Sequence, residues 1–446
     1  MSIKITTLPN GLKVIYQKSK SSVPISSVQI FCNVGNANLP PGMNGAAHFI
    51  EHMCFQGTKT HPDFQDIILE YTNFGAEYNG FTTARFTYYV IKCQDVTLQK
   101  CIKYMSEGVL DSNFSLEHFK KEEKVIIEEN MRNSDDPLHI LNMLTQKLLY
   151  ENTVFEYPPD DISYHKKGFN HKELLELYKS TYIPSNMVVS VSSNLSFSKI
   201  LTIIKKTHLN RGKLKMDPSI DKTNALLRVP PLIKGIKYSY HQINKLKTVF
   251  LNISFQTCSQ YNNEEKYILN FLGNLLCNSD SSRLMKVLRE KYGLVYSIKA
   301  ETNYYESGGN FTIYSQFNVE SFMSETKRSV LPVIIKELNH LVKNSVTQKE
   351  LNICKNNLKG YLLFGLQSID TQTLYNGSTY MLLKNPEEFV PLEKVFETYY
   401  EPITKEQIHS CVKKYFTLNR MCVSYVGGNL PSLKAVAKEC EKLMNK

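Results

Sequence analysis

The sequence predicts an α+β fold of two tandem homologous domains. The first observation is an internal repeat, because a helix-to-strand pattern at 171–191 recurs at 405–425. The second is a match of 115–126 with 347–358, at almost the same offset. Separate spans with nearly equal offsets indicate two copies of one unit that combines helices and strands. A chain of 446 residues is also long enough for two ordinary domains.

Hydrophobic periodicity and turn residues place the elements of the first copy. Asn10-Gly11 predicts a tight hairpin turn between the first two strands. The run from Gly57 to Thr60 is expected to end the first helix. The predicted strands are 3–7, 12–17, 26–34, 86–93 and 186–193, and the predicted helices are 44–56, 63–74, 98–111, 116–132 and 197–207.

The composition changes between the two copies. From 208 to 234 the chain is basic and contains Asp217-Pro218 and Pro230-Pro231, which is typical of a connecting segment. We therefore expect a first domain over 1–207, a linker over 208–234 and a homologous second domain over 235–446.

Composition narrows the class of protein. With 42% hydrophobic and 21% charged residues, no apolar run of transmembrane length, and no signal peptide or Arg-rich leader, we expect a cytoplasmic globular protein. Ten cysteines without a Cys-x-x-Cys pair indicate free, mostly buried thiols. The net charge of +11 permits acidic partners, but no nucleic-acid-binding motif accompanies it, so nucleic-acid binding is the weakest alternative.

The stretch Gly45–Met53 contains the pattern His-x-x-Glu-His. On a helix, His48 and His52 share one face, and two imidazoles at that spacing can hold one metal ion, usually Zn²⁺. Glu51 precedes the second histidine, and a carboxylate beside a metal-bound water can act as the base in hydrolysis. A short motif can also arise by chance. A third ligand would decide between these interpretations, because catalytic zinc usually has three protein ligands.

A glutamate on the predicted helix 116–132, Glu129, completes a resemblance to the pitrilysin/insulinase peptidase family, which carries a glutamate ligand at this distance after its His-x-x-Glu-His. The similarity is greatest to half-length members, which include mitochondrial processing peptidases and their bacterial relatives. It implies that His48, His52 and Glu129 bind one zinc ion and that Glu51 is the base. It also implies, for each domain, a mostly antiparallel β-sheet packed with helices.

Two further glutamates lie on the same predicted helix as Glu129. Glu122 is one heptad earlier on the same face, and the resemblance implies that it supports a zinc ligand. Glu128 is the competing ligand, but it should point about 100° away around the helix. At the offset of 115–126 to 347–358, Tyr361 stands opposite Glu129, and the second copy has no His-x-x-Glu-His, so we expect the metal site in the first copy only.

The resemblance extends over nearly the whole chain. Leu8–Leu12 is similar to the family's opening hairpin, and Asn79 falls in its substrate-bordering edge strand. Arg289 and Tyr296 match a segment whose arginine and tyrosine reach the substrate at the zinc, with Gly293 expected to end the helix between them.

Two positions depart from the family. Gly80 stands where relatives usually have alanine, and Arg85 stands where relatives often have an acid. Because this segment borders the substrate groove, we expect the cleavage preference to differ from that of relatives.

The favoured function is therefore a zinc-dependent endopeptidase that hydrolyses extended polypeptides, bound as an added strand near 79–87. The alternative is a non-catalytic core or assembly subunit of the same fold. A half-length chain would not enclose a substrate alone, so we expect a homodimer, or otherwise a heterodimer with a related subunit.

Overall fold

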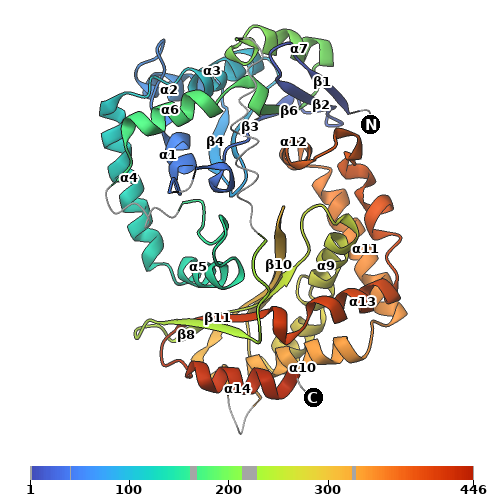
Figure 1. Ribbon diagram of the computed structural model, residues 1–446. Coiled ribbons are helices and arrows are strands. Elements are labelled where there is room, and N and C mark those ends of the chain that lie inside the picture. Colours follow the sequence, from blue (N-terminus) through green and yellow to red (C-terminus); the bar gives the residue numbers. More distant parts are fainter. Residues whose placement is uncertain (1–2, 41, 161–167, 213–228, 324–327, 445–446) are drawn as a thin grey trace. The chain divides into compact units, whose positions relative to one another are not determined.

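The computed structural model describes residues 3–40, 42–160, 168–212, 229–323 and 328–444. The chain forms two compact units, which are shown in Figure 1 and described separately. Unit 1 comprises Met1–Asn130, Pro158–Leu226 and Leu362–Lys394, and unit 2 comprises Met131–Tyr157, Leu227–Tyr361 and Val395–Lys446.

Unit 1 is built on a six-stranded sheet in the order β1-β2-β6-β3-β5-β4. Its strands are β1 Lys4–Thr7, β2 Lys13–Lys18, β3 Ile25–Cys32, β4 Glu77–Thr82, β5 Thr87–Gln94 and β6 Met187–Ser193. Only the pair β2 and β6 is parallel among these strands, and the remaining pairs are antiparallel. The strand β4 forms one edge of the sheet, because it pairs with β5 alone among the described strands.

Unit 2 repeats this topology in a five-stranded sheet of order β7-β11-β8-β10-β9. Its strands are β7 Lys237–Gln242, β8 Thr248–Thr257, β9 Ser297–Tyr305, β10 Gly308–Asn318 and β11 Met421–Gly427. Here too one pair, β7 with β11, is parallel, and the others are antiparallel. The order matches that of unit 1, without a counterpart of β1 among the described strands, so the predicted tandem α+β architecture is confirmed.

The helices that cover the sheets come from both copies. Those of the first half are α1 Ala46–Met53, α2 Phe64–Asn73, α3 Leu98–Leu110, α4 Leu116–Asp135, α5 Pro137–Leu149, α6 His171–Thr181 and α7 Phe197–Lys205. Those of the second half are α9 Asn263–Leu276, a π-helix Met285–Lys291, α10 Val330–Lys343, α11 Gln348–Gly365, α12 Ile369–Leu382, α13 Lys405–Tyr415 and α14 Leu433–Met444. The pairs α6/α13 and β6/β11 are related by the same offset as the repeated pattern in the sequence.

One predicted helix is shorter than expected. The helix α1 begins at Ala46, after Gly45 in a left-handed conformation with φ of 81°, and it ends at Met53. The end predicted at Gly57 is therefore wrong by several residues. Thr58 instead forms an isolated β-bridge with Ser112, which draws this part of the chain away from the helix axis.

Each unit contains one helix from the other half of the sequence. The helix α12 packs on β3 and β6 in unit 1, and α5 packs on β8 and β11 in unit 2 (Figure 1). Their first residues, 137 and 369, have the same offset as 115–126 and 347–358, so they are equivalent helices of the repeat. The compact units consequently do not coincide with the contiguous halves 1–207 and 235–446. Most of the predicted linker 208–234 lies outside the described residues.

The exchanged helix covers a face of the sheet that carries both apolar and polar residues, with Ile15, Phe31 and Val188 packed against Tyr380. In unit 1, the face toward α1 and α3 is apolar and carries Val28 and Ile30. The opposite face carries Gln17 and Gln29, which are buried under α12. The Asn376 amide of α12 donates to Gln17 Oε1 at 2.6 Å, and Gln29 Nε2 donates to a backbone carbonyl of α12.

All ten cysteines are free and buried, as predicted. Within the described ranges, no helix has the length and apolar character needed to span a membrane.

Candidate metal centre

Helix α1 brings two imidazoles together. Its apolar residues, among them Phe49 and Met53, are buried, which fixes the rotation of the helix and turns the two histidines to one side. His48 and His52 are one turn apart, and their Nε2 atoms lie 3.3 Å from each other. The predicted pair on one helical face is therefore present.

Helix α4 supplies the carboxylates. Phe119, Glu122 and Ile126 form its buried face, and Glu129 continues that face two turns after Glu122. The Oε2 atom of Glu129 lies 3.6 Å from His52 Nε2 and 4.0 Å from His48 Nε2. The competing Glu128 is exposed, as the 100° step around the helix predicts.

The three donor atoms fit a tetrahedral metal ion. His48, His52 and Glu129 form the one group of three possible ligands found among the described residues. Their separations of 3.3, 3.6 and 4.0 Å are close to the edge of a zinc tetrahedron, about 3.3 Å for bonds of about 2.0–2.1 Å. Three protein ligands are the number that a catalytic zinc site would need, because such sites keep one position for water or substrate.

Glu122 contacts one of the candidate ligands. Its Oε2 atom lies 3.0 Å from His52 Nδ1, and the Glu122 side chain is only 6% exposed. An imidazole that donates from Nδ1 presents an unprotonated Nε2 lone pair to a metal. The position that the sequence assigned to Glu122 is thus consistent with its expected support of a ligand.

Burial sets the electrostatics of the site. It lowers the pKa of His48, and the neighbouring His52 lowers that pKa further, which favours the neutral, metal-binding form. Burial also lowers the pKa of His52, but the hydrogen bond with Glu122 and the charges of Glu51, Glu122 and Glu129 outweigh it and raise that pKa overall. Burial raises the pKa of Glu51, which is the direction that a proton-accepting base near neutral pH requires.

Glu51 is held on the side of α1 that faces β4. Its Oε2 atom accepts a hydrogen bond of 2.5 Å from Thr82 Oγ1. Sequence reasoning noted the segment Asn79–Thr82 but missed Thr82 as a partner of Glu51. The available signal was the period of a strand, since Gly80 and Thr82 lie on one face.

The remaining residues of the edge segment have local partners. Asn79 Oδ1 accepts a hydrogen bond from the backbone N–H of Gly80 at 2.9 Å. Arg85 Nη1 donates to Asn38 Oδ1 at 2.5 Å.

Arg289 and Tyr296 belong to unit 2, whereas the metal-binding group belongs to unit 1. The Arg289 guanidinium lies 5.4 Å from the centroid of the Tyr296 ring, which is 83% exposed. The helix that carries Arg289 ends before Tyr296 as predicted, with Gly293 in a left-handed conformation at φ of 60°.

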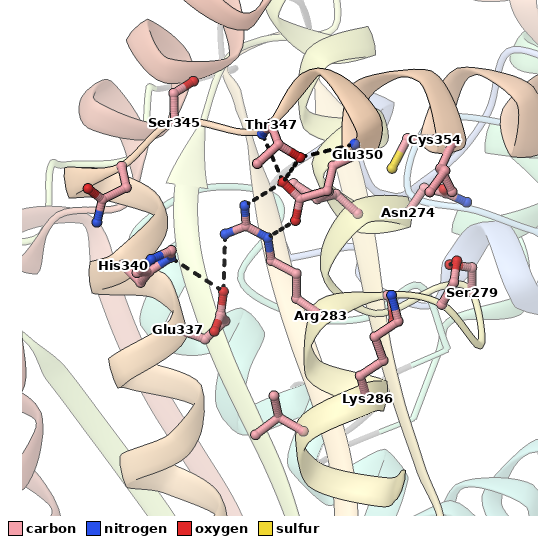
Figure 2. Close-up of a pocket in the computed structure, with 16 residues that line it drawn as sticks. Asn274, Ser279, Arg283, Lys286, Glu337, His340, Ser345, Thr347, Glu350 and Cys354 are labelled. Carbon is pink, nitrogen blue, oxygen red and sulfur yellow. Dashed lines mark hydrogen bonds and ion pairs between the residues drawn. The ribbon is translucent and has the colours of Figure 1, made fainter. Parts of the chain in front are cut away.

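A separate cavity of about 490 Å³ lies in unit 2, between α9, the π-helix, α10 and α11 (Figure 2). Arg283 dominates its polar wall, because Nε and Nη2 donate to Glu350 at 2.7 and 3.0 Å. The Nη1 atom donates to Glu337 at 3.1 Å. The guanidinium is therefore engaged by two carboxylates and acts within unit 2 as a link between the π-helix, α10 and α11.

Comparisons with known proteins were made against family models and curated sequences. The model described as "Insulinase (Peptidase family M16)" matches residues 13–157, and that described as "Peptidase M16 inactive domain" matches residues 168–358. The chain is similar to a Bacillus subtilis protein named uncharacterized zinc protease YmxG. The identity is 26% over 436 residues, covering 96% of this chain and 100% of the relative.

Solved structures share the fold over the full length. A protease from Helicobacter pylori has a TM-score of 0.83 at 20% identity, covering 96% of this chain and 99% of that one. A Pseudomonas fluorescens structure titled "peptidase M16 inactive domain" has a TM-score of 0.81 at 17% identity, covering 97% and 100%. Since models of one peptidase family match both halves, and the His48–His52–Glu129 group fits its motif, the chain belongs to the insulinase (pitrilysin) family, peptidase family M16.

Proposed function

We propose that this chain is a zinc-dependent endopeptidase. The observation that carries the proposal is the convergence of His48, His52 and Glu129 within 4.0 Å, beside a buried Glu51 carboxylate. Three protein ligands with an adjacent base are the parts that metal-assisted hydrolysis of a peptide bond requires.

Each residue of the candidate site has a separate role in the proposed reaction. His48, His52 and Glu129 would hold zinc, which when bound acts as a Lewis acid and lowers the pKa of water. Glu51 would act as the base, accepting a proton from the attacking water and returning it to the leaving amine. Glu122 keeps His52 in the tautomer that binds the metal.

Substrate would bind in an extended conformation along β4. This strand is an edge of its sheet, and an edge strand presents backbone donors and acceptors to an added peptide. We further propose that Asn79 contacts this peptide and that Arg289 and Tyr296 bind its backbone or the developing oxyanion.

The second candidate is a non-catalytic core or assembly subunit. It is supported by the family model described as an inactive domain, which matches residues 168–358. The region matched by that model excludes the proposed catalytic set. All four residues of this set are present in the first copy, namely His48, Glu51, His52 and Glu129. We therefore favour the peptidase.

Glu51→Gln provides the test. The variant should bind zinc and fold as the wild type does, but cleavage of an unbiased peptide library should fall by at least about 10²–10⁴-fold, because glutamine cannot accept the proton. Wild-type protein that contains zinc yet cleaves no member of the library would favour the non-catalytic alternative. Retained cleavage in Glu51→Gln would assign the base to another residue.

The homodimer and the cytoplasmic location remain predictions. Light scattering, with specific activity followed on dilution, tests the first. A monomer of about 51.3 kDa with full activity at nanomolar concentration would contradict it, and an inactive monomer rescued by a second protein would indicate a heterodimer.

A further inference from the structure

The Glu51 carboxylate rests against the edge strand β4. One oxygen, Oε2, accepts the hydrogen bond from Thr82, and the side chain is buried. The other oxygen, Oε1, lies where a side chain at position 80 would begin. A Cβ built on Gly80 would be 2.6 Å from Oε1 and 2.8 Å from Cε2 of Phe55. Glycine at position 80 therefore leaves the space that the carboxylate occupies.

The direction of the Thr82 hydrogen bond is fixed by its surroundings. Thr82 Oγ1 lies 3.3 Å from Thr87 Oγ1 on the paired strand β5. Thr87 donates its own hydroxyl proton to the backbone carbonyl of Val34 at 2.8 Å. The Thr82 hydroxyl is thus free to donate to Glu51, which as a carboxylate can only accept.

We propose that Thr82 is the positioning residue for the Glu51 base. A charge-assisted hydrogen bond of this kind selects one side-chain rotamer of Glu51. Because β4 is also the strand to which an extended peptide would add, the same strand sets the positions of base and substrate. The catalytic part of this inference rests on the proposed peptidase function, whereas the positional part rests on geometry alone.

The catalytic consequence is tested by two substitutions. Thr82→Val keeps the shape but removes the hydroxyl, and Thr82→Ser keeps the hydroxyl. We expect Thr82→Val to lower kcat on the order of 10- to 100-fold, the effect of a lost hydrogen bond to a charged group, with KM changed by less than about threefold. Thr82→Ser should retain most of kcat. An unchanged kcat in Thr82→Val, or equal losses in both variants, would overturn the proposal.

A second measurement uses metal-free protein and needs no activity. The urea midpoint of unfolding is compared for wild type, Thr82→Val, Glu51→Ala and the double variant. We expect Thr82→Val to lower the midpoint in the wild-type background and to have little effect once Glu51 is alanine. Additive midpoints would overturn the proposal. Thr72→Val, on the exposed side of α2, serves as the control and should show the same small change in both backgrounds.

The two measurements separate the inference from the function. Non-additive midpoints in a protein that cleaves nothing would support the positioning of Glu51 by Thr82 and overturn the peptidase proposal. An active wild type whose variants show additive midpoints would support the peptidase proposal but contradict the proposal that Thr82 positions Glu51.

Discussion

Phe119 of α4 stacks on Phe49 of α1, with ring centroids 4.8 Å apart and 21° between the ring planes. Phe49 follows His48 directly, and Phe119 lies one turn before Glu122. This contact joins the two helices that carry the proposed ligands, so the spacing of those ligands depends on the apolar packing behind them.

The first prediction concerns this stacked pair. Phe119→Ala should lower the free energy of unfolding by about 3–5 kcal/mol, the usual cost of removing a buried phenylalanine, and should also weaken zinc binding. Urea unfolding and competition with a chelator measure the two effects. Phe364→Ala, whose ring is 67% exposed, is the control and should leave both unchanged. Unaltered zinc affinity in Phe119→Ala would show that the helices hold their separation without this contact.

The second prediction concerns the number of zinc ions. Elemental analysis should give one zinc per chain, because the second copy has no equivalent group among its described residues. His52→Ala should lose tight zinc retention, whereas His241→Ala, on the exposed strand β7, should keep it. Two zinc ions per chain, or full zinc in His52→Ala, would contradict the assignment.

The third prediction concerns Glu122. Glu122→Ala should weaken zinc binding by about 10–100-fold, because His52 loses the partner that fixes its tautomer. Glu128→Ala removes an exposed glutamate from the same helix and should not alter zinc affinity. Equal losses of zinc affinity in the two variants would indicate that negative charge in general, not the orientation of His52 by Glu122, supports zinc binding.

Sequence reasoning reached His48 and His52 by their helical spacing, whereas Glu129 and Glu122 came from the resemblance to the family. His48 and His52 are four apart and Glu122 and Glu129 are seven apart, so each pair could be placed on one face without tertiary information. The contact between Glu51 and Thr82 is different, because it depends on how α1 packs on β4. The separation of these two residues along the chain follows no local period.

The packing of α12 on the sheet of unit 1 could not be predicted from local sequence patterns either. The side of α12 that packs on the sheet includes the buried residues Gln372, Thr373 and Asn376, so hydrophobic periodicity does not mark it. The strand β3 carries Ser27 and Gln29 on the face opposite Val28 and Ile30, and polar residues on one face usually indicate that this face is in water. In the structure that face, which also carries Phe31, is buried under α12, and hydrogen bonds such as that between Gln17 and Asn376 compensate the burial of its polar groups.

The fourth prediction uses the ion pair in the unit 2 cavity. Burial by itself raises the pKa of Glu350, but the hydrogen bonds from Arg283 and Thr347 outweigh it and bring that pKa to about 2. A folded-state pKa below the ordinary value of 4.5 contributes stability that is present above that value. The contribution is lost as the pH falls toward 2, and it is at most about 3 kcal/mol after allowance for solvent screening.

Glu350→Gln should therefore be less stable than wild type at pH 6, and the difference should shrink as the pH falls from about 4.5 toward about 2. Urea unfolding at several pH values measures this difference. Glu117→Gln, at an exposed position of α4, is the control and should show little difference at any pH. A difference for Glu350→Gln that does not change with pH would mean that lost packing, not charge, is responsible.

The fifth prediction tests the exchanged helix. Gly377 of α12 lies against Phe31 of β3. A Cβ added at position 377 would overlap the Phe31 ring at Cε2 and would lie 2.6 Å from its Cζ atom. Gly377→Ala should gain about 0.5–1 kcal/mol from helix propensity but lose about 1–3 kcal/mol or more from overpacking, so the clash dominates and the variant is less stable. Gly360→Ala, inside α11 with nothing within 4 Å of the added Cβ, should instead be stabilised. Opposite signs for these two substitutions in urea unfolding would support the packing of α12 on β3. A stabilised Gly377→Ala would mean that this helix does not lie on the sheet of unit 1.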